Sequence, residues 1–165
     1  NESNVYSLER GLHNRQYRGI FSSNIGRQFR PALNPDSNGS MGRIQAVDMS
    51  EQEFAWRHRQ PSPIISSVLA TAGGLVFVGD LNRGFKALDE ETGEVLWESL
   101  LNDVPSSTIA TYSVNDKQYI ALVVGQTGYH VNDWTRMYGY FAEDEGMPIN
   151  DSPKGGAAIW VFALD

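Results

Sequence analysis

Residues 71–97, TAGGLVFVGDLNRGFKALDEETGEVLW, decide the fold. They end on Trp97, eight positions after Asp89, and the same pattern occurs upstream. When residues 46–56 (AVDMSEQEFAW) are placed over 87–97 (ALDEETGEVLW), Ala, Asp and Trp coincide at an offset of 41 residues, from 46 to 87. A period near 40 residues is typical of propeller blades, because each blade needs four short strands and three turns. The sequence therefore predicts a β-propeller repeat.

One complete blade can be parsed from the pattern alone. Its four predicted strands are 67–72, 75–80, 85–89 and 95–100, separated by GG, LNRG and EETGE. In the last turn Gly93 can adopt a positive φ, and Asp89 and Thr92 can bond local backbone N–H groups. Trp97 supplies apolar area for packing against a neighbouring blade. In the upstream copy Gln52 stands where the turn glycine is expected.

The segments on either side of this blade read as incomplete blades. Downstream, strands are predicted at 106–114, 117–125 and 157–165, and upstream at 3–9, 43–48 and 53–56. We expect an all-β partial propeller of about three blades over residues 1–165, incomplete at both ends. Its blade parts are 1–60, 61–101 and 102–165, with insertions at 10–41 and 126–156. Because unpaired sheet edges template aggregation, we expect another polypeptide to complete the ring.

Composition excludes several classes of function. The 16 Gly, 7 Pro and 11% aromatic residues favour strands joined by turns. The net charge is −7 and the 13 Lys and Arg residues form no basic face, so we expect no nucleic acid partner. No apolar stretch approaches the roughly 20 residues of a membrane span. There is no Cys, and the three His residues lack ligand spacing, so we expect no metal site built from this chain alone.

Two motifs resemble a known family. The runs LATAGGLVFVGDLNRGFKALDEETGEVLWESLL (69–101) and TYSVNDKQYIALVVG (111–125) are similar to the C-terminal blades of pyrroloquinoline-quinone (PQQ)-dependent alcohol dehydrogenases. The resemblance implies an eight-bladed periplasmic propeller that holds PQQ beside a Ca²⁺ or lanthanide ion. It also implies oxidation of a small alcohol by hydride transfer to the quinone, with electrons passed to a cytochrome c.

The resemblance also suggests which residues contact the quinone and the substrate. In this family the catalytic base and the metal ligands come from blades upstream of this segment, so no catalytic or metal-binding residue is assigned here. Glu9, in NVYSLE, matches a polar position near the quinone, and Ile65, in PIISSVLAT, falls where many members have a Trp beside it. Tyr129, in GQTGYH, falls where members often have a Trp that lines the substrate cavity.

The long insertion at 126–156 adds one further candidate. Long loops on a rigid scaffold tend to be functional, so Trp134 joins Tyr129 as a substrate-lid candidate. The alternative is that these rings only pack the loop against its own blade.

Other readings remain open. Asp80 and Arg83, in GDLNRG, fit a structural ion pair or a hairpin turn better than a cofactor contact. The whole chain could instead be a non-catalytic propeller scaffold for protein–protein interaction, or a solitary β-domain. The missing blades could belong to a separate subunit or to a cleaved part of one precursor.

Overall fold

The computed structural model describes residues 33–125, 129–149 and 156–164. Within these ranges the elements follow one another in chain order as η2 (Pro35–Ser37), β1 (Gly42–Asp48), β2 (Glu53–Gln60), β3 (Leu69–Ala70), β4 (Leu75–Gly79), β5 (Gly84–Asp89), β6 (Val95–Leu100), β7 (Ala110–Val114), β8 (Lys117–Val124), α1 (Tyr129–Glu145) and β9 (Ala158–Leu164). The predicted strands of the described ranges are therefore confirmed, with β3 and β7 shorter than expected.

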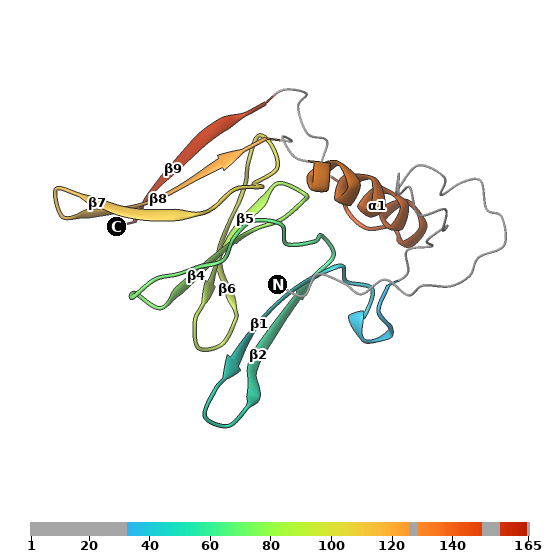
Figure 1. Cartoon of the computed structure of the whole chain (residues 1–165), viewed down its shortest axis with the longest axis horizontal. Coiled ribbons are helices and arrows are strands. Elements are labelled where there is room, and N and C mark those ends of the chain that lie inside the picture. The colour runs from blue at the N-terminus through green and yellow to red at the C-terminus, as the bar shows by residue number, and fades with distance from the viewer. Residues whose placement is uncertain (1–32, 126–128, 150–155, 165) are drawn as a thin grey trace.

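The strands form three antiparallel sheets. The first is β1-β2, the second β3-β4-β5-β6 and the third β7-β8-β9. Figure 1 shows the three sheets fanned out in chain order. Helix α1 lies beside the strand ends that are opposite the tips of hairpins β1–β2 and β7–β8. These antiparallel sheets form a partial β-propeller, the predicted fold class. The predicted strand 3–9 lies outside the described residues.

Two apolar cores hold the sheets face to face. Between the first and second sheets, Ile44 packs with Val76, Val78 and Leu88. Between the second and third, Phe85, which has no exposed surface, packs with Ile120 and Leu122. Phe85 and Phe162 bring their ring centroids to 5.4 Å across this second interface. Burial of these side chains is the main force that aligns the sheets.

The repeat seen in the sequence is also a repeat of backbone geometry. Asp48 accepts hydrogen bonds from the backbone N–H groups of the residues two and three positions later, and Asp89 does the same. Gln52 (φ 56°) and Gly93 (φ 72°) both adopt the left-handed conformation. The ladders shift register after Ala46 in one copy and after Ala87 in the other. The same short motif therefore builds the same turn twice.

The spacing of the motif is explained by the way that one copy packs on the next. Trp56 Nε1 donates a hydrogen bond of 2.7 Å to Glu90 O in the turn of the second sheet. The Trp56 ring also occupies the space where a side chain on Gly93 would lie. Trp97, at the matching position of the second sheet, packs edge-on against Phe162 of the third, with centroids 5.1 Å apart. The predicted packing of Trp97 on a neighbouring sheet is confirmed.

Helix α1 occupies part of the predicted insertion 126–156, where the sequence was interpreted as a loop. That interpretation was wrong over Tyr129–Glu145. Val131, Trp134, Tyr138 and Ala142 recur at helical spacing and form one apolar face that packs on loop residues such as Leu81 and Val104. None of the helices in the described ranges has the length and apolarity needed to cross a membrane.

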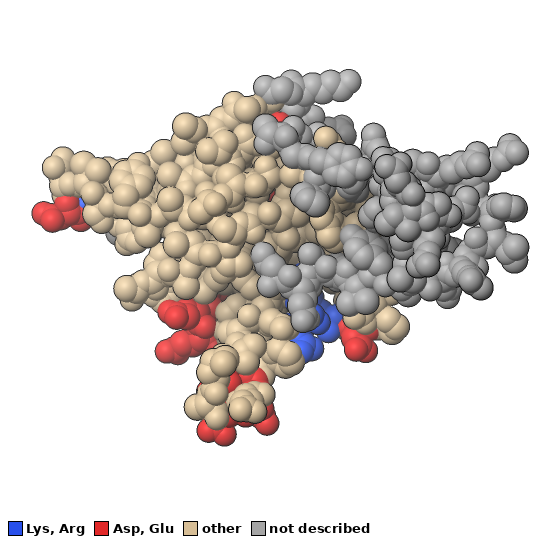
Figure 2. Space-filling view, in the orientation of Figure 1, with Lys and Arg blue, Asp and Glu red and all other residues tan. Residues whose placement is uncertain are grey.

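Acidic side chains lie at the tips of several hairpins. Figure 2 shows them at the tips of the hairpins β1–β2, β5–β6 and β7–β8, which point away from α1. These tips carry Asp48, Glu51, Glu53, Glu90, Glu91, Glu94 and Asp116. Hydrogen bonds from Ser50 and Thr92 lower the pKa values of Asp48 and Asp89 respectively, which keeps these turn carboxylates ionised.

Candidate functional site

The structure brings together two of the four predicted site residues. Ile65 and Trp134 are both half-buried and pack into one apolar cluster, whose buried members are Met41, Leu81, Val104, Val131, Met137, Tyr138 and Ala142. This cluster lies where α1 meets the loops of the second sheet, and we call it the α1 cluster. Tyr129 is the first residue of α1, but its side chain is outside the described part of the chain, as is all of Glu9.

Ile65 is held by backbone contacts to the end of β4. Its N–H donates to Gly79 O at 3.2 Å, and the preceding residue, Ile64, forms an antiparallel bridge with Asp80. Leu81 N donates to Pro63 O at 2.9 Å. The segment that carries Ile65 is therefore fixed to the turn after β4.

Trp134 is positioned by the packing of α1 in this cluster. Tyr138, one turn further on, is buried in the same cluster, and its hydroxyl donates to Pro148 O just beyond the helix. Burial, with the nearby negative charge of Asp80 as a smaller cause, raises the pKa of Tyr138 to about 12. The hydroxyl therefore stays protonated and keeps its role as a donor.

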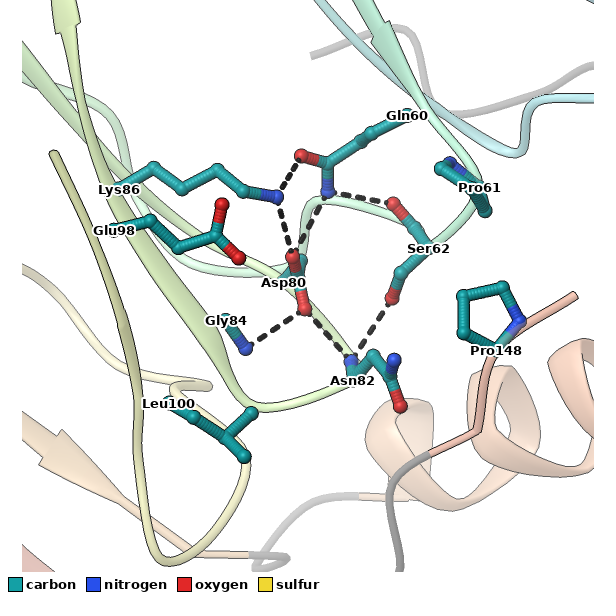
Figure 3. Close-up of a pocket in the computed structure, with 10 residues that line it drawn as sticks. All are labelled: Gln60, Pro61, Ser62, Asp80, Asn82, Gly84, Lys86, Glu98, Leu100 and Pro148. Atoms are coloured by element: carbon teal, nitrogen blue, oxygen red, sulfur yellow. Dashed lines mark hydrogen bonds and ion pairs between the residues drawn. The ribbon is translucent and has the colours of Figure 1, made fainter. Parts of the chain in front are cut away.

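A buried polar network lies beside this cluster, centred on Asp80 (Figure 3). Asp80 Oδ1 accepts hydrogen bonds from Asn82 N and Gly84 N, each at 2.9 Å. Asp80 Oδ2 accepts from Gln60 Nε2 and from Lys86 Nζ, each at 3.1 Å. Lys86 Nζ also donates to Gln60 Oε1 at 2.7 Å. The network thus joins the first sheet to the second, and both carboxylate oxygens are satisfied.

Of the two structural alternatives for Asp80 and Arg83, an ion pair or a hairpin turn, the structure shows the hairpin turn. Asp80 pairs with Lys86, and the side chains of the two are 6% and 13% exposed. Arg83 takes a left-handed conformation (φ 69°) and donates to Leu101 O at 3.3 Å. The turn directs the Arg83 side chain toward the strand connection after β6, whereas Lys86 lies on β5 next to the carboxylate.

The network forms one wall of a small pocket. The pocket has a volume of about 140 Å³ and is lined by Gln60, Pro61, Ser62, Asp80, Asn82, Gly84, Lys86, Glu98, Leu100 and Pro148. Figure 3 shows Pro148, from the segment after α1, across the pocket from Lys86 and Glu98. The described ranges contain no group of three or more His, Asp or Glu side chains with metal-binding geometry.

His58 borders the same network on β2. Its Nε2 atom is buried and has no hydrogen-bond partner among the described residues. Burial lowers the pKa of His58, and the positive charge of Lys86 lowers it further, against smaller opposing effects of Gln60 and Glu98. The folded protein therefore disfavours protonation of His58 compared with the unfolded chain.

This shift predicts a loss of stability in mild acid. Because the folded pKa of His58 is depressed, its contribution is complete above the unfolded value of about 6.5 and declines as pH falls through that value toward the folded pKa. Melting temperatures measured from pH 8 to pH 5 should fall more steeply for the wild type than for His58→Gln, which cannot be protonated. Parallel curves for the two proteins would show that His58 does not titrate in this way.

Three comparisons with known proteins point to one family. Residues 3–120 match the PQQ family, described as the β-propeller domain of glucose, ethanol and alcohol dehydrogenases. The chain is 30% identical over 143 residues to a quinoprotein ethanol dehydrogenase of Pseudomonas aeruginosa, covering 87% of this chain and 21% of that protein. It is 32% identical over 143 residues to 1-butanol dehydrogenase (cytochrome c) of Thauera butanivorans, covering 86% of this chain and 18% of that protein.

A solved structure supports the fold. A europium-containing methanol dehydrogenase aligns with a TM-score of 0.61 and 25% identity, over 77% of this chain and 24% of that protein. The chain spans about a fifth of the length of the two curated relatives.

Proposed function

The chain belongs to the PQQ family of glucose, ethanol and alcohol dehydrogenase β-propellers, and we propose that it forms part of the wall around the quinone and the alcohol in such an enzyme. The observation that carries this proposal is the packing of Ile65 and Trp134 in one apolar cluster. These two positions come from separate segments, and they were assigned to the quinone and to the substrate independently. Both side chains lie at the margin of the same buried cluster, which is compatible with two walls of one cavity.

The residues of the α1 cluster suit this role. A flat aromatic quinone needs an apolar surface that excludes water, and Ile65 offers such a surface on a backbone fixed by Gly79. When bound, the quinone supplies the hydride acceptor, and a Ca²⁺ or lanthanide ion beside it supplies Lewis-acid polarisation. Trp134 and Tyr129 would shape the space for the alcohol, and Glu9 would lie near the quinone. We assign the catalytic base and the metal ligands to the rest of the enzyme.

The remaining blades are proposed to come from another polypeptide, either a separate subunit or a processed part of the same precursor. The third sheet supports the presence of a further blade, because the face turned away from the second sheet exposes several large apolar side chains. They are Tyr112, Val114, Val123, Ile159 and Val161, of which Ile159 is 73% exposed. Such a contiguous apolar face is typical of an interaction surface, and here it would be covered by the next blade.

We also propose a periplasmic location and transfer of electrons to a cytochrome c. The relative from Thauera butanivorans is named as a cytochrome c-linked 1-butanol dehydrogenase. The europium in the solved methanol dehydrogenase is a lanthanide, which supports a Ca²⁺ or lanthanide ion as the metal. In the proposed complete propeller, the metal ion would lie beside the quinone, and the cytochrome c would bind to the assembled enzyme.

The proposal can be tested by reconstitution. The chain should be co-produced with the polypeptide that carries the remaining blades, loaded with PQQ and Ca²⁺ or a lanthanide, and assayed for dye reduction with small alcohols. We expect bound quinone and alcohol-dependent reduction. Absence of both from an assembled, loaded complex would refute the enzyme assignment and leave a propeller scaffold as the better description.

A substitution tests the substrate wall in that complex. Trp134→Ala is expected to reduce kcat/KM for small alcohols about 10- to 100-fold, because the loss of a large apolar wall is worth roughly 1–3 kcal/mol in discrimination. Trp97→Phe is the matched control, since Trp97 lies between the second and third sheets and outside the α1 cluster. Equal effects of the two substitutions on kcat/KM would remove Trp134 from the substrate site.

A further inference from the structure

We propose that Asp80 is a positioning residue, which holds the segment carrying Ile65 and the helix carrying Trp134 in register from outside the cavity. This inference rests on the proposed function for its link to alcohol oxidation. The structural part of the inference is independent of the proposed function, because it is argued from contacts among the described residues.

The carboxylate of Asp80 joins segments that are distant in the sequence. One oxygen fixes the turn at Asn82 and Gly84, and the other binds Gln60, at the end of the first sheet. Gln60 in turn donates from Nε2 to Ser62 O at 2.8 Å. A single side chain therefore determines how the turn after β4 sits against the chain that leaves the first sheet.

That chain leads directly to Ile65. Ser62 Oγ accepts from Asn82 N at 2.9 Å, Pro63 O accepts from Leu81 N, and Ile64 bridges to Asp80. These links tie four consecutive residues, 62–65, to the turn that Asp80 organises. Displacement of the turn would move Ile65 with it.

The same turn supports α1. Leu81, immediately after Asp80, is buried in the α1 cluster with Trp134 and Tyr138. The charge of Asp80 also contributes to the raised pKa of Tyr138, so the carboxylate lies within electrostatic reach of the helix. Asp80 is therefore linked through its neighbours to both candidate site residues without belonging to their cluster.

The local structure is shaped to hold this carboxylate. A side chain on Gly84 would approach Asp80 Oδ2 to 2.5 Å, so the glycine leaves room for it. A buried ion pair is not an efficient source of stability, since an apolar replacement of similar volume is often as stable. The carboxylate is better explained by the orientation that its four hydrogen bonds impose.

The test uses Asp80→Asn in the reconstituted, loaded complex, with Asp89→Asn as the control. Asp89 caps a turn in a similar way, but at the end of the molecule away from α1. We expect Asp80→Asn to lower kcat/KM for alcohols about 10- to 100-fold, because small misplacement of site residues has effects of this size. We expect it to change the relative preference for short and long alcohols as well. The control should alter neither quantity.

A second readout is independent of activity. The contribution of Trp134 to fluorescence is the difference between each protein and its Trp134→Phe counterpart. Asp80→Asn should change the wavelength and acrylamide quenching of this contribution, and Asp89→Asn should not. If the wild-type complex oxidises no alcohol, the proposed function fails, and the fluorescence still decides the positioning role.

A neutral double variant covers the case in which Asp80→Asn does not fold. Asp80→Asn with Lys86→Met buries no unpaired charge and is expected to fold. It should show the same change in Trp134 fluorescence, because the carboxylate that binds Gln60 is gone. A folded variant with wild-type Trp134 fluorescence and alcohol preference, or one altered only in melting temperature, would overturn the inference.

Discussion

Replacement of Lys86 by Met is expected to destabilise the folded protein by about 3–5 kcal/mol, the usual consequence of removing one partner from a buried ion pair. Met is close to Lys in length, so the change leaves little empty space and isolates the loss of charge. Asp80, whose side chain is 6% exposed, then keeps its carboxylate in the interior without a counter-ion. The measurement is the free energy of unfolding from urea titration.

Two companion variants show whether the charge is responsible. Lys117→Met, on the exposed β7–β8 hairpin, should change stability by no more than about 1 kcal/mol, the usual upper value for an exposed charge. Adding Asp80→Asn to Lys86→Met should restore most of the lost stability, because the unpaired carboxylate is then removed. A single Lys86→Met substitution that costs under 1 kcal/mol would mean that water reaches the Asp80 carboxylate.

Replacement of Gly93 by Ala is expected to be the second severe change, costing roughly 3 kcal/mol or more. The residue has φ 72°, a conformation that costs an L-residue about 1–2 kcal/mol. The new methyl group would also meet the Trp56 ring and displace it from Glu90. The loss should appear as a lower urea midpoint for unfolding, and Trp56 should become more accessible to quenchers.

Gly74 provides the matched control for this change. It has φ 78°, and a methyl group added there meets nothing within 4 Å. Gly74→Ala therefore pays only the backbone cost, about 1–2 kcal/mol. Equal destabilisation by the two substitutions would show that the packing of Trp56 on the next sheet adds no stability.

The sequence allowed most of the fold to be predicted because its information is local and repeated. Asp, a left-handed residue and Trp recur at fixed distances in 46–56 and 87–97, and each has a geometric role in the turn. Gln52 serves at the glycine position, so the turn needs the left-handed conformation and not the glycine itself. Alternating apolar residues then placed the remaining strands.

Helix α1 was missed because aromatic and glycine residues in 129–145 resemble a loop in composition. The signal that could have found it is the recurrence of Val131, Trp134, Tyr138 and Ala142 at intervals of three and four residues. A test for helical period in the insertion would have detected this stripe.

The candidate site could be predicted only in part, since it depends on contacts between distant segments. Ile65 and Trp134 were identified one at a time, and tertiary packing places both against the same buried cluster. The sequence placed Asp80 and Arg83 in a structural ion pair or a hairpin turn, and did not identify Lys86, six residues after Asp80, as the partner of its carboxylate. The geometry of the turn decides which cationic side chain faces the carboxylate across a hairpin. The left-handed φ of Arg83, which is part of that geometry, could not be predicted from the sequence.

The central claim is that this chain supplies part of the quinone wall of a larger propeller, and quinone content measures it most directly. The polypeptide that carries the remaining blades should be purified with and without this chain, incubated with PQQ and Ca²⁺ or a lanthanide, and analysed for bound quinone. We predict about one quinone per complex when the chain is present and none that survives gel filtration when it is absent. Equal quinone retention in both preparations would contradict the claim.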